Sequence, residues 1–186
     1  MQEKVKKDEK VAFFLLTSVK FSLKLLLSGN LWGKVVGSGM DMLTGEYRNT
    51  LDEKGRILFP SKLRTVLAGN VLIVTQALDR CLWLFTPEEW RVVSSKLMDS
   101  ASPFSEKNRL VLRRFIAPAQ ELEFDRSGRI SIPQSLREYA SLSKECILLG
   151  VNKYIELWDA ESYKAYLEQS ENSFRDAAEE LGGIIF

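Results

Sequence analysis

Histidine is absent from the sequence, and cysteine occurs only twice in 186 residues. The first absence excludes Ser-His-Asp and Cys-His nucleophile systems, histidine zinc sites and histidine general bases. Cys81 and Cys146 form no CxxC pair, so no thiolate metal site or dithiol redox site is expected. Each lies in an apolar run (CLWLF or CILLG), which indicates a reduced, buried thiol. Without a glycine-rich phosphate loop or a cluster of catalytic spacing, we expect no cofactor, no metal and no enzyme.

The sequence also lacks a strong net charge, since 26 Lys and Arg oppose 25 Asp and Glu. Residues 1–41 hold seven Lys and four acidic residues, which leaves 26 − 7 = 19 basic and 25 − 4 = 21 acidic residues for 42–186. Residues 156–186 hold eight acidic and two basic residues, so residues 42–155 carry 17 − 13 = +4. A mildly basic body with an acidic end permits nucleic-acid binding without requiring it.

Long apolar runs are scarce, and the longest lies in a 41-residue leader. Its uninterrupted part, residues 11–19, is too short for a membrane span, and Lys20 follows at once. No small-x-small cleavage site of a signal peptide follows either, whereas an amphipathic surface helix stays open. We interpret residues 1–41 as a mis-called start, with the native start at Met40 or Met42, or as a disordered leader without an assigned function.

An internal repeat dominates the rest of the chain. LDEKGRILFPSKLR (51–64) aligns with FDRSGRISIPQSLR (124–137) at an offset of 125 − 52 = 73, with seven of fourteen positions identical. The same offset pairs CLWLFTPEEW (81–90) with YIELWDAESY (154–163). We therefore predict two copies of one module, divided as a first repeat with its helix (42–98), a linker helix (99–117), a second repeat (118–169) and an acidic C-terminal tail (170–186).

Each copy has the pattern of a few short strands closed by a helix. An extended run (46–51 or 121–124) leads to D-x-x-G-R, a turn in which Asp accepts backbone amides and Gly takes positive φ. A short strand ended by Pro, one helical turn and a strand pair with turns at LDR or VNK follow. The predicted longer helices are 87–98 after Thr86, 106–115 after Ser105, and 160–181 after Asp159 and before Gly182-Gly183. This pattern predicts an α+β fold.

These segments resemble the MraZ family, within the AbrB-like swapped-hairpin superfamily. The resemblance rests on MLTGEYRNTLDEKGRILFP, ELEFDRSGRISIPQSLREYASL and IELWDAESY, and covers residues 42–169. It implies two tandem AbrB-like swapped-hairpin β modules that form a small β-barrel, with a linking helix pair and a C-terminal helix. It also implies a cytoplasmic, nucleoid-associated transcriptional regulator. Such a regulator binds double-stranded DNA at short direct repeats upstream of the division and cell-wall gene cluster, including its own promoter, as a ring-shaped homo-oligomer. No membrane partner or small-molecule substrate is implied.

Two D-x-x-x-R motifs are the candidate DNA-contact sites. An arginine beside a turn glycine can project from the loop and bind guanine O6 and N7 or a phosphate. Alternatively, each Asp–Arg pair holds its own turn closed, or one of the two loops serves the subunit interface. The candidate DNA contacts are Arg48, Lys54, Arg56, Lys62, Arg126 and Arg129, and the loop-organising residues are Asp52, Gly55, Asp125 and Gly128. Arg64 is expected beside the first loop and Arg137 beside the second.

Other basic and aromatic residues have plainer interpretations. The basic face of helix 106–115 (Lys107, Arg109, Arg113, Arg114) either touches phosphate or is solvated while Leu110, Val111 and Phe115 pack on the barrel. Trp83, Trp90 and Trp158 are expected in the core or an interface. A structural or partner-binding ring is a competing function for a duplicated β module. An antitoxin-like regulator, with toxin binding after Asp159, is another.

Overall fold

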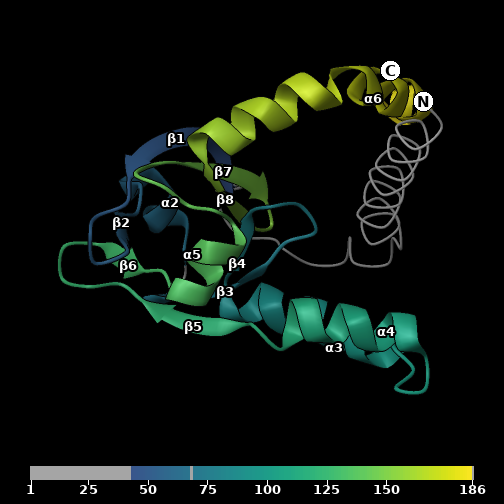
Figure 1. Cartoon of the computed structure of the whole chain (residues 1–186), viewed down its shortest axis with the longest axis horizontal. Coiled ribbons are helices and arrows are strands. Elements are labelled where there is room, and N and C mark those ends of the chain that lie inside the picture. Colours follow the sequence, from purple (N-terminus) through teal and green to yellow (C-terminus); the bar gives the residue numbers. More distant parts are fainter. Residues whose placement is uncertain (1–42, 68, 186) are drawn as a thin grey trace, which may run out of the picture. The chain divides into compact units, whose positions relative to one another are not determined.

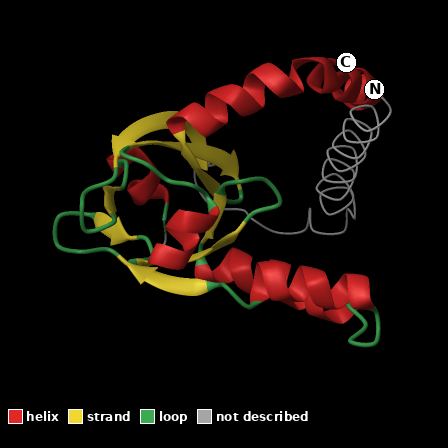
Figure 2. Cartoon of the chain, viewed as in Figure 1, coloured by secondary structure: helices red, strands yellow, loops and turns green. Residues whose placement is uncertain are grey.

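The computed structural model describes residues 43–67 and 69–185 (Figure 1), so the leader interpreted from residues 1–41 lies outside the described residues. Both copies of the repeat belong to one compact unit, Asp41–Phe186. The elements are β1 (Leu43–Thr50), β2 (Arg56–Leu58), α2 (Ser61–Val66), β3 (Val71–Gln76), β4 (Leu82–Phe85), α3 (Pro87–Ser100), α4 (Glu106–Val111), the π-helical turn η1 (Leu112–Ile116), β5 (Gln120–Glu123), β6 (Arg129–Ser131), α5 (Gln134–Tyr139), β7 (Glu145–Asn152), β8 (Ile155–Asp159) and α6 (Ala160–Ile185). The α+β class is confirmed (Figure 2).

The strands form a six-stranded antiparallel sheet in the order β1-β7-β8-β4-β3-β5, and a separate pair, β2-β6. β1 and β5 are the edges, so over residues 43–67 and 69–185 the strands do not close into the barrel that the resemblance implies. Closure needs a ladder between the two edge strands. Those strands are paired at one side only.

The two copies are interleaved rather than set side by side. The leading strand of each copy pairs with the other copy, β1 with β7 and β5 with β3. The short strands after the two turns pair with each other, with Ile57 opposite Ile130. The two arms of the first turn share only the isolated bridge between Leu51 and Ile57. Each turn therefore leads its chain away from its own copy and into the other.

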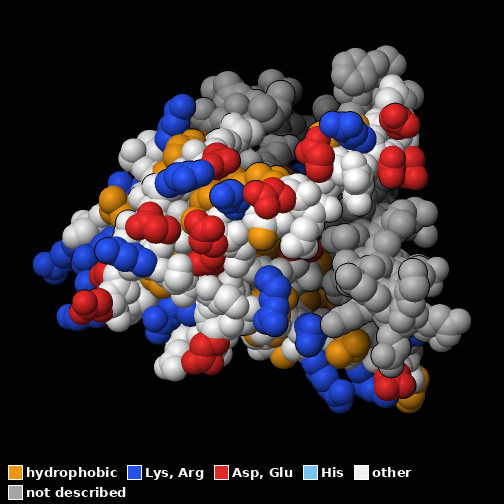
Figure 3. Space-filling model, turned by 45° about the horizontal axis from the view of Figure 1, so that its top comes forward, with side chains coloured by type: hydrophobic (Ala, Val, Ile, Leu, Met, Phe, Trp, Pro, Cys, Tyr) orange, Lys and Arg blue, Asp and Glu red, His pale blue; other side chains and the backbone are white. Residues whose placement is uncertain are grey.

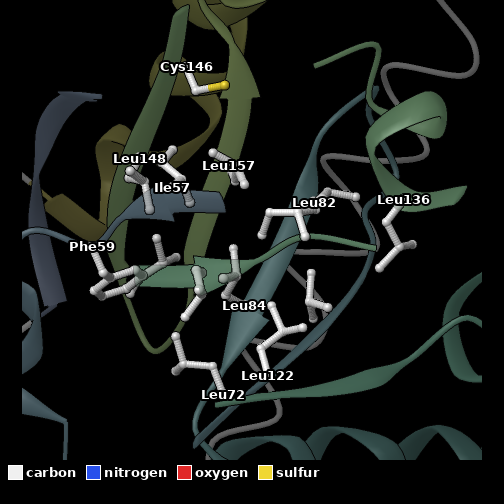
Figure 4. Close-up of a cluster of buried hydrophobic side chains, with 14 of the residues drawn as sticks. Ile57, Phe59, Leu72, Leu82, Leu84, Leu122, Leu136, Cys146, Leu148 and Leu157 are labelled. Carbon is white, nitrogen blue, oxygen red and sulfur yellow. The ribbon is translucent and has the colours of Figure 1, made fainter. Parts of the chain in front are cut away.

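The buried side chains explain this exchange. Ile57 and Ile130 are fully buried, and the two helical turns that follow them insert Leu63 and Leu136 into the same cluster. Figure 4 shows labelled members of this cluster from both copies, such as Ile57 and Leu84 of the first and Leu148 and Leu157 of the second, gathered in one core. One shared core buries more apolar surface than two modules of this size could bury separately. The shared core thus favours interleaving.

The local predictions for helix starts and hairpins are confirmed. Thr86 Oγ1 accepts the Glu89 amide at 3.2 Å, and Ser105 Oγ accepts the Asn108 amide at 3.4 Å. Asp159 Oδ1 accepts the amide of Ser162 at 3.1 Å. LDR lies between β3 and β4, and VNK spans the end of β7 and the turn into β8, closed by Val151 N to Tyr154 O at 2.9 Å. These caps orient the helices where they leave the sheet.

Three details differ from the predictions. Helix α6 continues through Gly182 and Gly183 to Ile185, because a glycine ends a helix only where it turns left-handed, and both keep helical backbone here. The linker helix 106–115 becomes α4 followed by the π-helical turn η1. Leu110, expected to pack on the barrel, is 57% exposed, whereas Phe115 is buried. At 3.6 residues per turn, residues five apart lie about 140° apart around a helix, so Leu110 points away from the face that buries Phe115.

Aromatic side chains cover the outer face of the sheet. Trp83 packs edge-on against Phe115 at 5.7 Å between ring centroids, and Trp90 lies 5.5 Å from the same ring. Trp158 is buried, so the prediction of structural tryptophans is confirmed there. Indole Nε1 of Trp83 and of Trp158 donate to the Glu156 carboxylate at 3.2 and 2.8 Å, which joins the two copies. Burial raises the pKa of Glu156.

The two thiols are buried and form no disulfide, as predicted. Burial raises the pKa of Cys146 to about 12 and that of Cys81 as well. Such thiols are poor nucleophiles and poor metal ligands. Among the helices of the described residues, none combines the length and the apolar character needed to cross a membrane.

Candidate nucleic-acid interface

The first D-x-x-x-R loop is a closed turn built on Asp52. Its Oδ1 accepts the amides of Lys54 and Arg56 at 2.9 Å each, while its Oδ2 accepts Arg56 Nε at 2.8 Å and lies 2.7 Å from Nη2. The main chain closes the turn through Gly55 N to Asp52 O at 2.9 Å and Asp52 N to Arg56 O at 2.8 Å. Gly55 has φ +73°, as the turn chemistry predicts. The Asp52 carboxylate therefore accepts two backbone amides and the guanidinium of Arg56 within one turn.

The second loop repeats this geometry around Asp125. Its Oδ1 accepts the amides of Ser127 at 2.8 Å and Arg129 at 3.0 Å, and its Oδ2 accepts Arg129 Nε at 2.8 Å. Gly128 has φ +74°, and its amide donates to Asp125 O at 2.9 Å. The intramolecular Asp–Arg pair considered as an alternative is thus present in both loops. The pair does not hide either arginine, since their side chains remain 30% and 33% exposed.

The two loops lie at the same end of the described chain, at the left in Figure 1. Lys and Arg side chains gather at this end among a few acidic ones (Figure 3). The side-chain hydrogen bond from Arg56 is the main reason why the pKa of Asp52 falls to about 2. In the second loop, the Arg129 amide and then its guanidinium lower the pKa of Asp125. Asp52 raises the pKa of Arg56, and Asp125 of the other loop adds to this, because pairing of β2 with β6 brings the loops together.

The placement of Arg64 and Arg137 corrects the sequence-based expectation. Each was expected beside the loop of its own copy, but the guanidinium of Arg137 lies against Gly55 and that of Arg64 lies against Gly128. The cause is the exchange of strands. Since β2 and β6 pair antiparallel and the residue after each strand bonds to the opposite loop's glycine, the helical turn that follows each strand begins beside the opposite loop.

The remaining basic candidates lie at exposed positions. Lys54, Lys62 and Arg126 are exposed. Arg48 lies on edge strand β1, with its side chain 77% exposed and its Nε 3.8 Å from Glu46. The loops therefore bring together Asp52, Gly55 and Arg56 with Arg137, and Asp125, Gly128 and Arg129 with Arg64. Only a prediction of non-local strand pairing would have found the crossed partners.

In the described ranges 43–67 and 69–185, no group of three or more Cys, Asp or Glu residues is placed to hold a metal ion. The site can instead offer two guanidinium groups, each oriented by a carboxylate that remains ionised at neutral pH. Such groups suit anionic or base-edge partners that accept paired hydrogen bonds.

The fold and the site define a duplicated α+β protein that presents two matched Asp–Arg turns at one end. The family model described as "MraZ protein, putative antitoxin-like" matches the chain twice, over residues 42–114 and 115–183. The chain therefore belongs to the MraZ family. It is 54% identical over 144 residues to a protein named transcriptional regulator MraZ from Treponema denticola, which covers 77% of this chain and 100% of that protein. Identity to the protein of the same name from Treponema pallidum (strain Nichols) is 49% over 138 residues, 74% of this chain and 93% of that protein.

Proposed function

We propose that this protein is a sequence-specific DNA-binding transcriptional regulator. The single observation that carries the proposal is the pair of matched turns, which orient Arg56 and Arg129 at one end of the molecule. An oriented guanidinium can contact guanine or phosphate without the entropy loss of a free side chain. The names of the similar Treponema proteins support the regulatory part of the proposal.

The proposed target follows the family resemblance. The protein binds short direct repeats upstream of the division and cell-wall gene cluster, including its own promoter, and is cytoplasmic and nucleoid-associated. Arg48, Lys54, Lys62 and Arg126 supply the flanking positive charge, while Asp52, Gly55, Asp125 and Gly128 organise the loops. The interleaved strands then correspond to AbrB-like swapped hairpins, divided between repeats 42–98 and 118–169.

Assembly into a homo-oligomer, a ring in the family's pattern, follows from the weak charge of one subunit. DNA affinity grows with the number of phosphates neutralised, and residues 42–186 carry −2 in total. Repeating a few contacts in several subunits raises the affinity by multivalency. Exposed apolar side chains on the helices outside the sheet and on the α3–α4 connection are available for subunit contacts: Met98, Phe104, Leu110, Leu167 and Phe174. The same side chains favour a partner-binding scaffold as the second candidate function.

The test is a fluorescence anisotropy titration of the full chain with labelled DNA from upstream of its own gene. Scrambled DNA of equal length is the competitor, and the titration is repeated at several salt concentrations. We expect selective binding that weakens steeply as salt rises, because counterions are released from the phosphates. Equal affinity for both DNAs would contradict the proposal and leave the partner-binding scaffold as the leading function.

A further inference from the structure

Each turn glycine is occupied on its open face by an arginine of the opposite copy. A Cβ atom placed on Gly55 would lie 2.7 Å from Arg137 Cζ and 2.9 Å from its Nε and Nη1. A Cβ on Gly128 would collide with Nη1 of Arg64 and lie 2.5 Å from its Cζ. The guanidinium groups therefore rest on the loop backbone at a distance that only glycine allows.

The main chain repeats the same crossing. Gly55 O accepts the amide of Ile132 at 2.8 Å, and Gly128 O accepts the amide of Phe59 at 3.0 Å. In each loop the glycine amide donates within its own turn, while the carbonyl and the Cα face contact the other copy. The position of each loop is thus set largely by the opposite copy.

The two crossed contacts are not equally deep. Arg137 is half-buried, and its Nε is buried without a hydrogen-bond partner. Arg64 is exposed. A half-buried guanidinium has less room to move away from its loop than an exposed one. The first loop is therefore held more firmly by its crossed arginine than the second.

We propose that Arg137 is a positioning residue for the first loop and Arg64 for the second, each holding the Asp–Arg pair of the opposite copy in the orientation that contacts DNA. The proposal rests on the proposed function. It predicts that each DNA-contact site is complete only when both copies of the module are present. Arg56 therefore depends on a residue that lies 81 positions away along the chain (137 − 56).

The first test needs no DNA. Backbone amide hydrogen exchange is measured for the full chain and for its Arg137→Ala and Arg64→Ala variants. The amides compared are the four hydrogen-bonded ones of each loop, at residues 52, 54, 55 and 56 and at residues 125, 127, 128 and 129. We expect at least severalfold faster exchange in the first loop for Arg137→Ala and in the second loop for Arg64→Ala, with the other loop unchanged. Acceleration in the variant's own copy, or in neither loop, would overturn the proposal.

A variant that retains the charge controls for general unfolding caused by Arg137→Ala. Arg137→Lys retains the positive charge and an aliphatic stem but lacks the planar guanidinium. We expect the same crossed pattern at smaller amplitude. If the first-loop amides of Arg137→Lys exchange at the wild-type rate, the guanidinium does not position the loop.

The second test separates positioning from general stability by double-variant cycles on DNA affinity. Once Arg56 is replaced by Ala, adding Arg137→Ala should cause little further loss, because the group it positions is gone. When Arg137→Ala is combined with Arg129→Ala, the fold-losses in DNA affinity of the two single variants should instead multiply. Multiplying losses in both pairs would overturn the proposal. If the wild type binds upstream and scrambled DNA equally well, the proposed function fails. The hydrogen-exchange pattern still tests whether Arg137 and Arg64 each position the loop of the opposite copy.

Discussion

The two D-x-x-x-R loops have the same internal geometry but different surroundings. Their glycine φ angles, +73° and +74°, and their Nε–Oδ2 distances, 2.8 Å in both, agree. Between the motif residues the first loop holds Glu53 and Lys54, whereas the second holds Arg126 and Ser127. A half-buried arginine supports the first loop and an exposed one supports the second.

This comparison separates what the motif determines from what the rest of the chain determines. Asp, Gly and Arg at fixed spacing specify the turn and the direction of the guanidinium in both copies. Charge at the tip and firmness of support come from residues outside the motif. The loops are therefore expected to contact DNA with similar geometry and to differ in how well they tolerate change.

The largest expected effect comes from removing either guanidinium. Arg56→Ala and Arg129→Ala should each weaken binding to the promoter DNA roughly tenfold to a hundredfold, the range of one good bidentate contact. Equal losses would support equivalent loops. A loss confined to Arg56→Ala, with Arg129→Ala altering the oligomer instead, would assign the second loop to the subunit interface. Anisotropy and light scattering together distinguish these results, with Arg175→Ala on helix α6, 71% exposed, as the matched control.

Replacement of the turn glycines sharpens the difference in support. Gly55→Ala and Gly128→Ala each place a side chain in left-handed backbone, at about 1–2 kcal/mol of unfolding free energy. Gly55→Ala should cost more, because the half-buried Arg137 has less room to move than the exposed Arg64. Urea denaturation measures both, and Gly69→Ala is the control because its Cβ would meet no atom within 4 Å. Equal costs would argue against unequal support.

A smaller effect is expected from neutralising the carboxylates. Asp52→Asn and Asp125→Asn retain an acceptor for the loop amides but remove the charge that orients the arginine. We expect DNA affinity to fall roughly two- to fivefold in each case, the range of exposed ion pairs. The measurement is the same anisotropy titration. An increase in affinity would show that the carboxylates restrain the arginines rather than present them.

The smallest effect is a difference in acid titration. Both aspartates have lowered pKa values, so their ion pairs stabilise the folded loops above the ordinary Asp value and lose this effect as pH falls. For Asp52 the loss runs from about pH 4 down through about pH 2. Carboxyl carbon NMR on Asp-labelled protein should give its midpoint near 2, assigned with Asp52→Asn. A midpoint at 3.8 or above would contradict the closed turn.

Sequence alone predicted the features that depend on neighbouring residues. The turns at Gly55 and Gly128 and the caps at Thr86 and Ser105 follow from local hydrogen-bonding chemistry, and the structure confirms them. The repeat offset also located both copies of the turn correctly. These features need no knowledge of which strands pair.

Features that depend on distant pairing could not be predicted in this way. Arg64 and Arg137 were assigned to the loops nearest in sequence, but exchange of β2 and β6 between copies places each at the other loop. In each case the free energy of the shared core decides between arrangements that are locally equivalent.

The central claim is that both loops of the duplicated module contact DNA. Hydrogen exchange of the full chain with and without its upstream DNA, against scrambled DNA, tests this most directly. We predict slower exchange in residues 52–56 and 125–129 alike with the upstream DNA, and a smaller change with the scrambled DNA. Unchanged exchange in either loop at a DNA concentration that saturates binding would contradict the account.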